Sequence, residues 1–73
     1  MTVAEIKEQY RKELFAFGES MTSNQKMQVA INLGIVFLTV QRYQSGKEEE
    51  VRNVELAESI LNECKSVTEK DTA

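Results

Sequence analysis

The chain has 73 residues, a formal net charge of −3 at neutral pH, no histidine and a single cysteine, Cys64. A chain this short forms one domain at most and buries only about 60% of the surface that its unfolded form exposes. One cysteine cannot close an internal disulfide, and without histidine the chain lacks the soft ligands of a tetrahedral zinc site. We therefore expect stabilisation by a partner chain, either a second copy or a different protein.

The charge is distributed unevenly along the chain. The first 26 residues carry four basic and four acidic side chains, whereas residues 47–73 carry four basic and eight acidic ones. Nucleic-acid-binding proteins usually present a basic face, because phosphate neutralisation supplies most of their affinity. No such face is evident here, which weighs against a nucleic-acid partner.

Neither a signal peptide nor a membrane span is indicated. Glu5, Lys7 and Glu8 interrupt any apolar run at the N-terminus. The longest uncharged run, Met27 to Gln41, contains several polar residues and is shorter than the roughly 20 apolar residues that a bilayer requires. With one free cysteine and no secretion signal, we expect a cytoplasmic protein.

A first helix is predicted over residues 3–17. Thr2 and Glu5 have the spacing of a capping box, and Gly18 stands where a left-handed C-cap would end the helix. One apolar stripe recurs at helical spacing between them, formed by Val3, Ile6, Tyr10, Leu14 and Phe17.

A second helix is predicted over residues 23–44. Thr22 and Gln25 have capping-box spacing, and Gly46 follows as a stop. The middle of this segment is apolar on nearly every side, so such a helix must be covered from several directions. The alternation from Val29 to Phe37 also permits a strand, but an isolated strand has nothing to pair with.

A third helix is predicted over residues 48–67. Its first three glutamates suit the positive end of a helix dipole, and residues 68–73 are expected to fray. An apolar seam runs along it, formed by Val54, Ala57, Leu61 and Cys64. The fold class is therefore all-α, a single domain over residues 1–73 in which the second and third helices form an antiparallel hairpin and the N-terminal helix packs across it.

No residue pattern indicates an enzyme. Cys64 would need a nearby base to act as a nucleophile, and it lies on the apolar seam, where a free cysteine behaves as a small hydrophobic residue. The glutamates lie on polar faces without a Glu-x-x-His spacing, and no glycine-rich phosphate loop is present. We predict no catalytic residue, no metal site, no cofactor and no small-molecule substrate.

The order of residues in the central segment resembles the helix-turn-helix of Cro-type phage repressors. The residues in register are Ala30, Leu33, Gly34, Ile35, Thr39, Val40, Arg42 and Tyr43. This resemblance implies that Gln25, Lys26, Thr39 and Arg42 face DNA. The chain departs from the family at Val36, Phe37 and Leu38, where the family has polar residues that enter the DNA groove.

The same segment also resembles the first helix of a tetratricopeptide-type helix pair. The matching residues are Ala30, Asn32, Leu33, Gly34, Phe37 and Tyr43. In that fold the glycine lets a neighbouring helix approach and the aromatic residue is buried between helices. The departures are Gly46, Glu50 and Asn53, which stand where the repeat has small and apolar residues. Only one unit fits, whereas such repeats need about three to be stable alone.

The apolar triplet at residues 36–38 favours a nearly continuous, buried helix and a protein-interaction function. We expect a small adaptor, chaperone-like cofactor or inhibitor that works as a homodimer or with an obligate protein partner. The predicted partner-binding face comprises Val29, Leu33, Val36, Phe37, Leu38, Val40 and Tyr43. The alternative is a small Cro-like DNA-binding transcriptional regulator.

Overall fold

The computed structural model describes residues 2–72, which form four α-helices and one turn of 3-10 helix. The elements are α1 (Val3–Ser20), α2 (Ser23–Leu33), α3 (Phe37–Tyr43), η1 (Glu48–Glu50) and α4 (Val54–Thr72). The all-α fold class is confirmed for this part of the chain, with four α-helices instead of the predicted three. Within residues 2–72 each helix is either too short or too polar to cross a bilayer.

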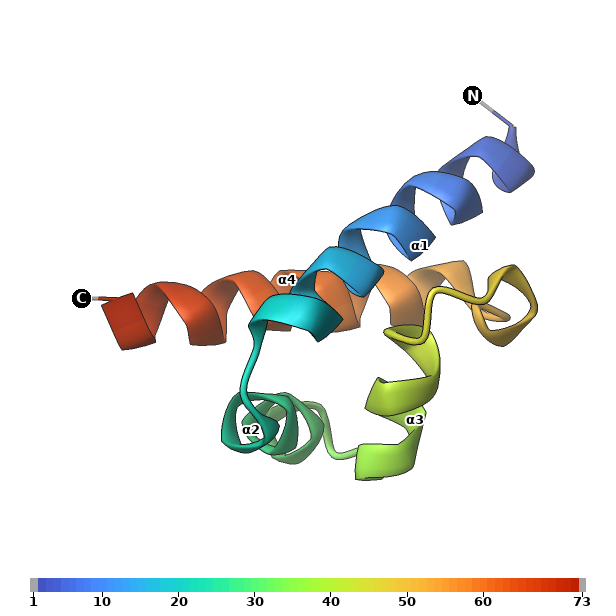
Figure 1. Ribbon diagram of the computed structural model, residues 1–73. Coiled ribbons are helices and arrows are strands. Elements are labelled where there is room, and N and C mark those ends of the chain that lie inside the picture. The colour runs from blue at the N-terminus through green and yellow to red at the C-terminus, as the bar shows by residue number, and fades with distance from the viewer. Residues whose placement is uncertain (1, 73) are drawn as a thin grey trace.

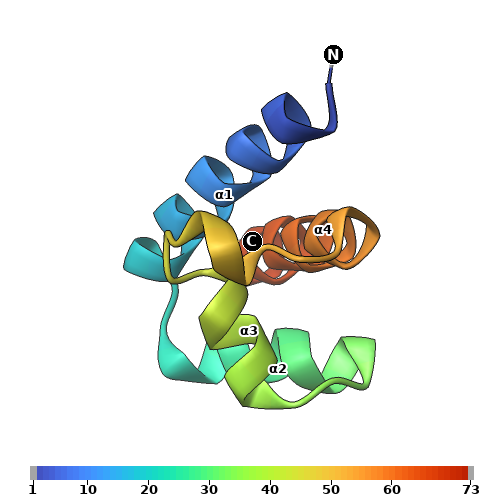
Figure 2. The same cartoon turned by 90° about the vertical axis from the view of Figure 1, so that its right-hand side faces the viewer.

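The longest helix, α4, packs against both α1 and α2, while α3 packs against α2 and α1. Figure 1 shows α1 crossing over α4 on one side, with α2 and α3 together on the other side. The view in Figure 2 agrees: the N-terminal turns of α1 lie at one end of the molecule and the α2–α3 pair at the opposite end. The core therefore lies where α4 meets α1 and α2, with α3 packed against both of these helices.

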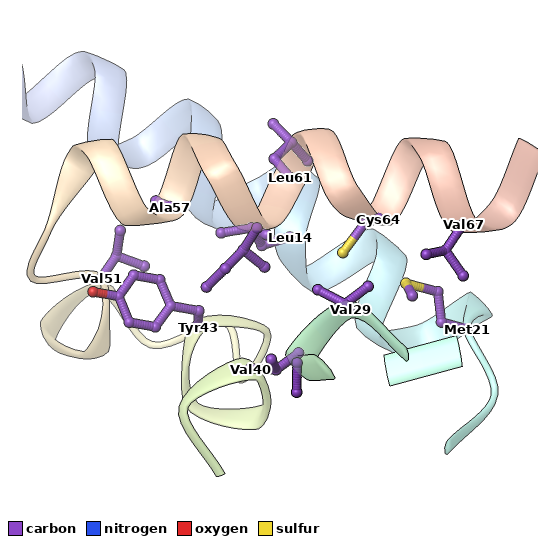
Figure 3. Close-up of a cluster of buried hydrophobic side chains, with 12 residues drawn as sticks. Leu14, Met21, Val29, Val40, Tyr43, Val51, Ala57, Leu61, Cys64 and Val67 are labelled. Atoms are coloured by element: carbon purple, nitrogen blue, oxygen red, sulfur yellow. The ribbon is translucent and has the colours of Figure 1, made fainter. Parts of the chain in front are cut away.

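Every helix contributes to this core. The buried apolar side chains include Leu14 from α1, Val29 from α2 and Val40 from α3, each 0% exposed. Figure 3 shows them gathered beneath the apolar seam of α4. The buried residues of that seam are Ala57, Ile60, Leu61, Cys64 and Val67. The seam predicted through Ala57, Leu61 and Cys64 is thus confirmed, while Val54 is half-buried.

The first helix begins as predicted but ends later. The Thr2 hydroxyl accepts a hydrogen bond from the backbone N–H of Glu5 at 3.2 Å, which caps the first turn. The predicted end at Phe17 is wrong, because α1 continues to Ser20 through Gly18. A Cβ atom at Gly18 would lie 2.9 Å from the backbone oxygen of Gln44. This glycine allows α1 to approach the end of α3 closely, and it does not act as a C-cap.

The predicted continuous helix over residues 23–44 is wrong, because the chain turns at residues 34–36. Gly34 adopts a left-handed conformation, with φ of 68°. The backbone N–H of Ile35 donates to the oxygen of Ala30 at 3.0 Å, and that of Gly34 donates to Ile31 at 3.1 Å. These two bonds form a Schellman motif, which satisfies the last carbonyl groups of α2 and ends it.

The third predicted helix starts six residues too early. Residues 48–50 form only a 3-10 turn, and α4 begins at Val54. The reason is local capping: the Asn53 side-chain oxygen accepts from the N–H of Leu56 at 3.1 Å, a direct bond that a row of glutamates does not replace. α4 then continues to Thr72, through residues that were expected to fray. Met1 and Ala73, the ends of the predicted domain, lie outside the described residues.

Gln44 is the one polar residue in the buried core of the described chain, at 5% exposure. Its Nε2 donates to the sulfur atoms of Met21 at 3.6 Å and Cys64 at 3.4 Å. Its Oε1 is buried without a hydrogen-bond partner among residues 2–72. An unpaired buried carbonyl oxygen carries its full desolvation penalty.

We therefore expect Gln44→Met to raise the free energy of unfolding by about 1 kcal/mol. Methionine has similar length and leaves no polar atom unpaired. Urea denaturation followed by circular dichroism measures the change, with the exposed Gln41→Met as a control that should leave stability unaltered. A destabilised Gln44→Met protein would mean that the weak bonds to sulfur outweigh the unpaired oxygen.

Candidate functional site

The segment singled out by the sequence folds into α2, a three-residue turn and α3. In Figure 1, α2 is viewed almost along its axis while α3 runs across the view, so the two axes are steeply inclined. The start of α2 is held by a complete capping box: Gln25 N–H donates to the Thr22 hydroxyl at 3.2 Å, and Thr22 N–H donates to Gln25 Oε1 at 2.8 Å. These two bonds satisfy the first backbone N–H groups of α2.

α3 is short, and tertiary contacts hold it in place. It has seven residues, and its N-cap, Val36, makes no side-chain capping hydrogen bond. Val40 and Tyr43 anchor it in the core. The Tyr43 hydroxyl also accepts a hydrogen bond from the backbone N–H of Asn53 at 3.2 Å, which ties α3 to the residue that caps α4.

The predicted partner-binding residues divide into two groups. Val29, Val40 and Tyr43 lie in the protein's own core, so they do not face outward. Leu33 and Phe37 are half-buried. Val36 and Leu38 are 66% and 53% exposed. The burial of residues 36–38, on which the interaction hypothesis depended, is therefore not observed for Val36 and Leu38.

The residues predicted to face DNA also differ in how far their side chains are exposed. Arg42 is exposed, whereas Gln25, Lys26 and Thr39 are half-buried. Gln25 uses its side-chain oxygen in the capping box. Of this set, Arg42 has the most accessible side chain.

α3 and the residues at its two ends present a set of exposed side chains, which we call the α3 face. Leu38, Gln41 and Arg42 are three or four positions apart and share one side of α3, while Val36 precedes the helix and Ser45 follows it. The members of this face, all exposed, are Val36, Leu38, Gln41, Arg42 and Ser45. This face combines two large apolar side chains with an amide, a guanidinium group and a hydroxyl.

The segment that carries the α3 face differs in charge from the rest of the protein. Residues 20–47 contain Lys26, Arg42 and Lys47 and no acidic residue, so this segment carries a charge of +3. Because the net charge of the whole chain is −3, all other residues together carry −6. Comparing the charge of residues 1–26 with that of residues 47–73 hides this basic segment, because Lys47 is then grouped with the glutamates that follow it. The absence of acidic residues between Glu19 and Glu48 is the signal in the sequence that reveals it.

Two of these basic residues line an open hollow of about 190 Å³ at the end of α3. Its lining residues are Gln41, Arg42, Ser45, Lys47 and Glu50. The Ser45 hydroxyl donates to the backbone oxygen of Arg42 at 2.7 Å and accepts from the N–H of Lys47 at 3.3 Å. These bonds fix the backbone beside the hollow, so that Arg42 and Lys47 offer two cationic groups next to the α3 face. The sequence analysis missed four residues of this surface, which are Gln41, Ser45, Lys47 and Glu50.

Cys64 is fully buried, at 0% exposure. Burial raises the pKa of its thiol from an ordinary value of 9.0 to about 11, although the hydrogen bond from Gln44 acts in the opposite direction. A thiol with a raised pKa is a poor nucleophile.

We expect two measurable consequences for Cys64. The thiol should react slowly with thiol reagents in the native protein and quickly after denaturation. Between pH 9 and pH 11 the unfolded chain binds fewer protons than the folded one, so the free energy of unfolding should fall, by roughly 2–3 kcal/mol in total. In Cys64→Ala this contribution to the fall of the free energy of unfolding with pH should be absent, as denaturation curves measured across this pH range would show. Fast labelling of the native protein would show that the seam is open.

Among residues 2–72 no group of three or more histidine, cysteine, aspartate or glutamate side chains is placed to hold a metal ion. The α3 face offers hydrogen-bond donors, positive charge and apolar contact area, which are the components of recognition. No family model, curated protein or solved structure matches this chain.

Proposed function

We propose that the protein is a small DNA-binding regulator of the helix-turn-helix type, in which α3 enters the major groove. The observation that carries this proposal is the break at Gly34, which places α3 at a steep angle to α2 with the Arg42 side chain exposed. A DNA-binding helix-turn-helix consists of two helices at a large angle, joined by a turn of three or four residues that often contains glycine. Its second helix reads the bases.

Burial in the central segment supports this proposal. A helix-turn-helix of this kind needs apolar residues of both helices packed inward and a basic residue of the second helix exposed. Ala30, Val40 and Tyr43 are 2%, 0% and 7% exposed, and Arg42 is exposed. Of the four residues that the resemblance places on DNA, Arg42 is exposed, while Gln25, Lys26 and Thr39 are half-buried.

The charge distribution supports the same orientation. Lys47 beside the hollow and Lys26 on α2 would contact DNA phosphates, which supply most of the affinity of such proteins. The remainder of the protein carries −6 and would be repelled by the phosphate backbone. Most of this negative charge lies in residues 48–73, which carry three basic and eight acidic side chains, so the asymmetry disfavours binding through α4 and favours the α2–α3 end.

The test is a selection of bound sequences from a random duplex pool with the purified full chain, followed by titration of the selected site at several salt concentrations. We expect one enriched sequence and an affinity that falls steeply with salt. If Lys26 and Lys47 both contact phosphates, the slope of log K against log salt approaches about −1.8 per bound chain. No enriched sequence, or salt-independent binding, would overturn the proposal.

We propose a protein-interaction module as the second candidate, because large apolar side chains are exposed on α2, on α3 and in the turn. Met27 and Ile31 are 45% and 65% exposed, and Val36 and Leu38 are 66% and 53% exposed. Such a surface suits helical docking to a second copy or to another protein, as an adaptor, chaperone-like cofactor or inhibitor would use it. Light scattering at high salt tests this candidate, since apolar association persists where DNA binding is lost.

A further inference from the structure

The α3 face carries two large apolar side chains at positions that contribute little to the fold. Val36 and Leu38 are 66% and 53% exposed, so the core gains little from them. Val36 also occupies the N-cap of α3 without a side-chain hydrogen bond, although serine, threonine, aspartate or asparagine would stabilise the helix there. Both side chains thus expose apolar surface, and Val36 also leaves the first turn of α3 without a capping hydrogen bond. We infer that these two side chains contact a partner outside the core.

The major groove of DNA offers one apolar feature to such side chains. Thymine carries a C5-methyl group at the groove edge, whereas the other groove positions are hydrogen-bond donors and acceptors. An apolar side chain placed against the amino group of cytosine would leave that donor desolvated and unpaired, which is unfavourable. Valine and leucine therefore discriminate in favour of thymine through contact and against cytosine through desolvation.

We propose that Val36 and Leu38 read thymine C5-methyl groups, so that the DNA site contains thymines opposite the start of α3. This inference rests on the proposed function and specifies the base that the α3 face recognises. The remaining members of the face complete the surface: Gln41 pairs well with adenine and Arg42 with guanine. The positive charge of residues 20–47 holds this face against the phosphates while the apolar side chains contact the methyl groups.

The experiment replaces each thymine of the selected site, one at a time, with deoxyuridine. This change removes only the C5-methyl group and preserves every hydrogen bond of the base pair. We expect about a 4-fold loss of affinity at each thymine that Val36 or Leu38 contacts, the effect of one buried methyl group, and no loss elsewhere. Replacing the same thymine with cytosine should weaken binding further, and 5-methylcytosine should restore part of the loss.

Protein variants assign the contacts to residues. Val36→Ser and Leu38→Ser should each abolish the thymine-over-deoxyuridine preference at one position while keeping the salt dependence of binding. Val36→Ser adds a capping hydroxyl to α3, so it should remain helical by circular dichroism. Ile31→Ser, which removes an equally exposed apolar residue from α2, is the matched control and should keep both preferences.

The outcomes separate this inference from the function on which it rests. DNA binding that tolerates deoxyuridine at every position would overturn the thymine assignment and leave the DNA-binding function intact. A preference that survives in both serine variants would also overturn it, because the methyl contact would belong to other residues. Failure to bind any duplex at low salt, with a salt-resistant oligomer in its place, would remove the function itself and the assignment with it.

Discussion

Arg42→Ala is expected to weaken binding to the selected DNA site by about 10- to 100-fold and to leave the melting temperature nearly unchanged. A well-placed arginine contact to a guanine is worth roughly 1–3 kcal/mol. The backbone oxygen of Arg42 accepts hydrogen bonds from Ser45 N–H at 3.2 Å and from the Ser45 hydroxyl at 2.7 Å. Alanine retains that oxygen. Fluorescence anisotropy and thermal melts of the same preparation measure the two effects.

Arg52→Ala is the matched control for this prediction. Arg52 is also exposed, and it lies between η1 and α4, outside the basic segment. Both variants remove one positive charge, so they change the net charge equally. We expect Arg52→Ala to bind DNA almost as well as the unmodified protein. Equal losses in the two variants would show that only overall charge matters, and α3 would then have no special role.

Leu14→Ala is expected to lower the free energy of unfolding by about 2–5 kcal/mol, the effect of creating a cavity at a fully buried leucine. Leu14 is 0% exposed on α1, and Figure 3 shows it facing the seam of α4. A domain of this size has a total stability of roughly 4–11 kcal/mol. The loss is therefore about half of what is available. Urea denaturation should show a large shift of the midpoint, or a chain that is already partly unfolded without urea.

Leu38→Ala removes the same atoms from an exposed position and is the control for Leu14→Ala. Leu38 is 53% exposed on α3, and substitutions at exposed positions usually change stability by about 0.5 kcal/mol or less. A Leu38→Ala protein as unstable as Leu14→Ala would contradict the exposed placement of Leu38. Leu38 would then be covered in solution by a second copy, which is the result expected of the protein-interaction candidate.

The helix starts that depend on neighbouring residues were predictable from the sequence. Thr2 and the pair of Thr22 and Gln25 cap α1 and α2 as their spacing indicates, because a capping bond joins residues only two or three positions apart. The burial of Ala57 and Cys64 followed from helical periodicity. These features are local, so residue order is enough to identify them.

The end of a helix was harder to predict where a glycine could either end the helix as a C-cap or allow another segment to approach closely. Gly18 and Gly34 both fit a C-cap pattern. Only Gly34 ends a helix, while Gly18 continues α1 and leaves room for Gln44. The difference arises from packing between residues that are far apart in the chain. The start of α4 posed a similar choice, in which the Asn53 cap prevailed over the dipole preference of Glu48 and its neighbours.

The candidate site was decided by tertiary structure more than any other part of the molecule. The apolar residues from Val36 to Leu38 are compatible with a buried helix as long as the chain runs straight through Gly34. Once the chain turns there, Val40 and Tyr43 fill the core from α3 and leave Leu38 on the outside. Composition alone cannot predict which of these apolar residues is buried, because the core has room for only some of them. The sequence by itself determined a small helical protein with well-defined helix starts, and tertiary packing decided which face of α3 is available to a partner.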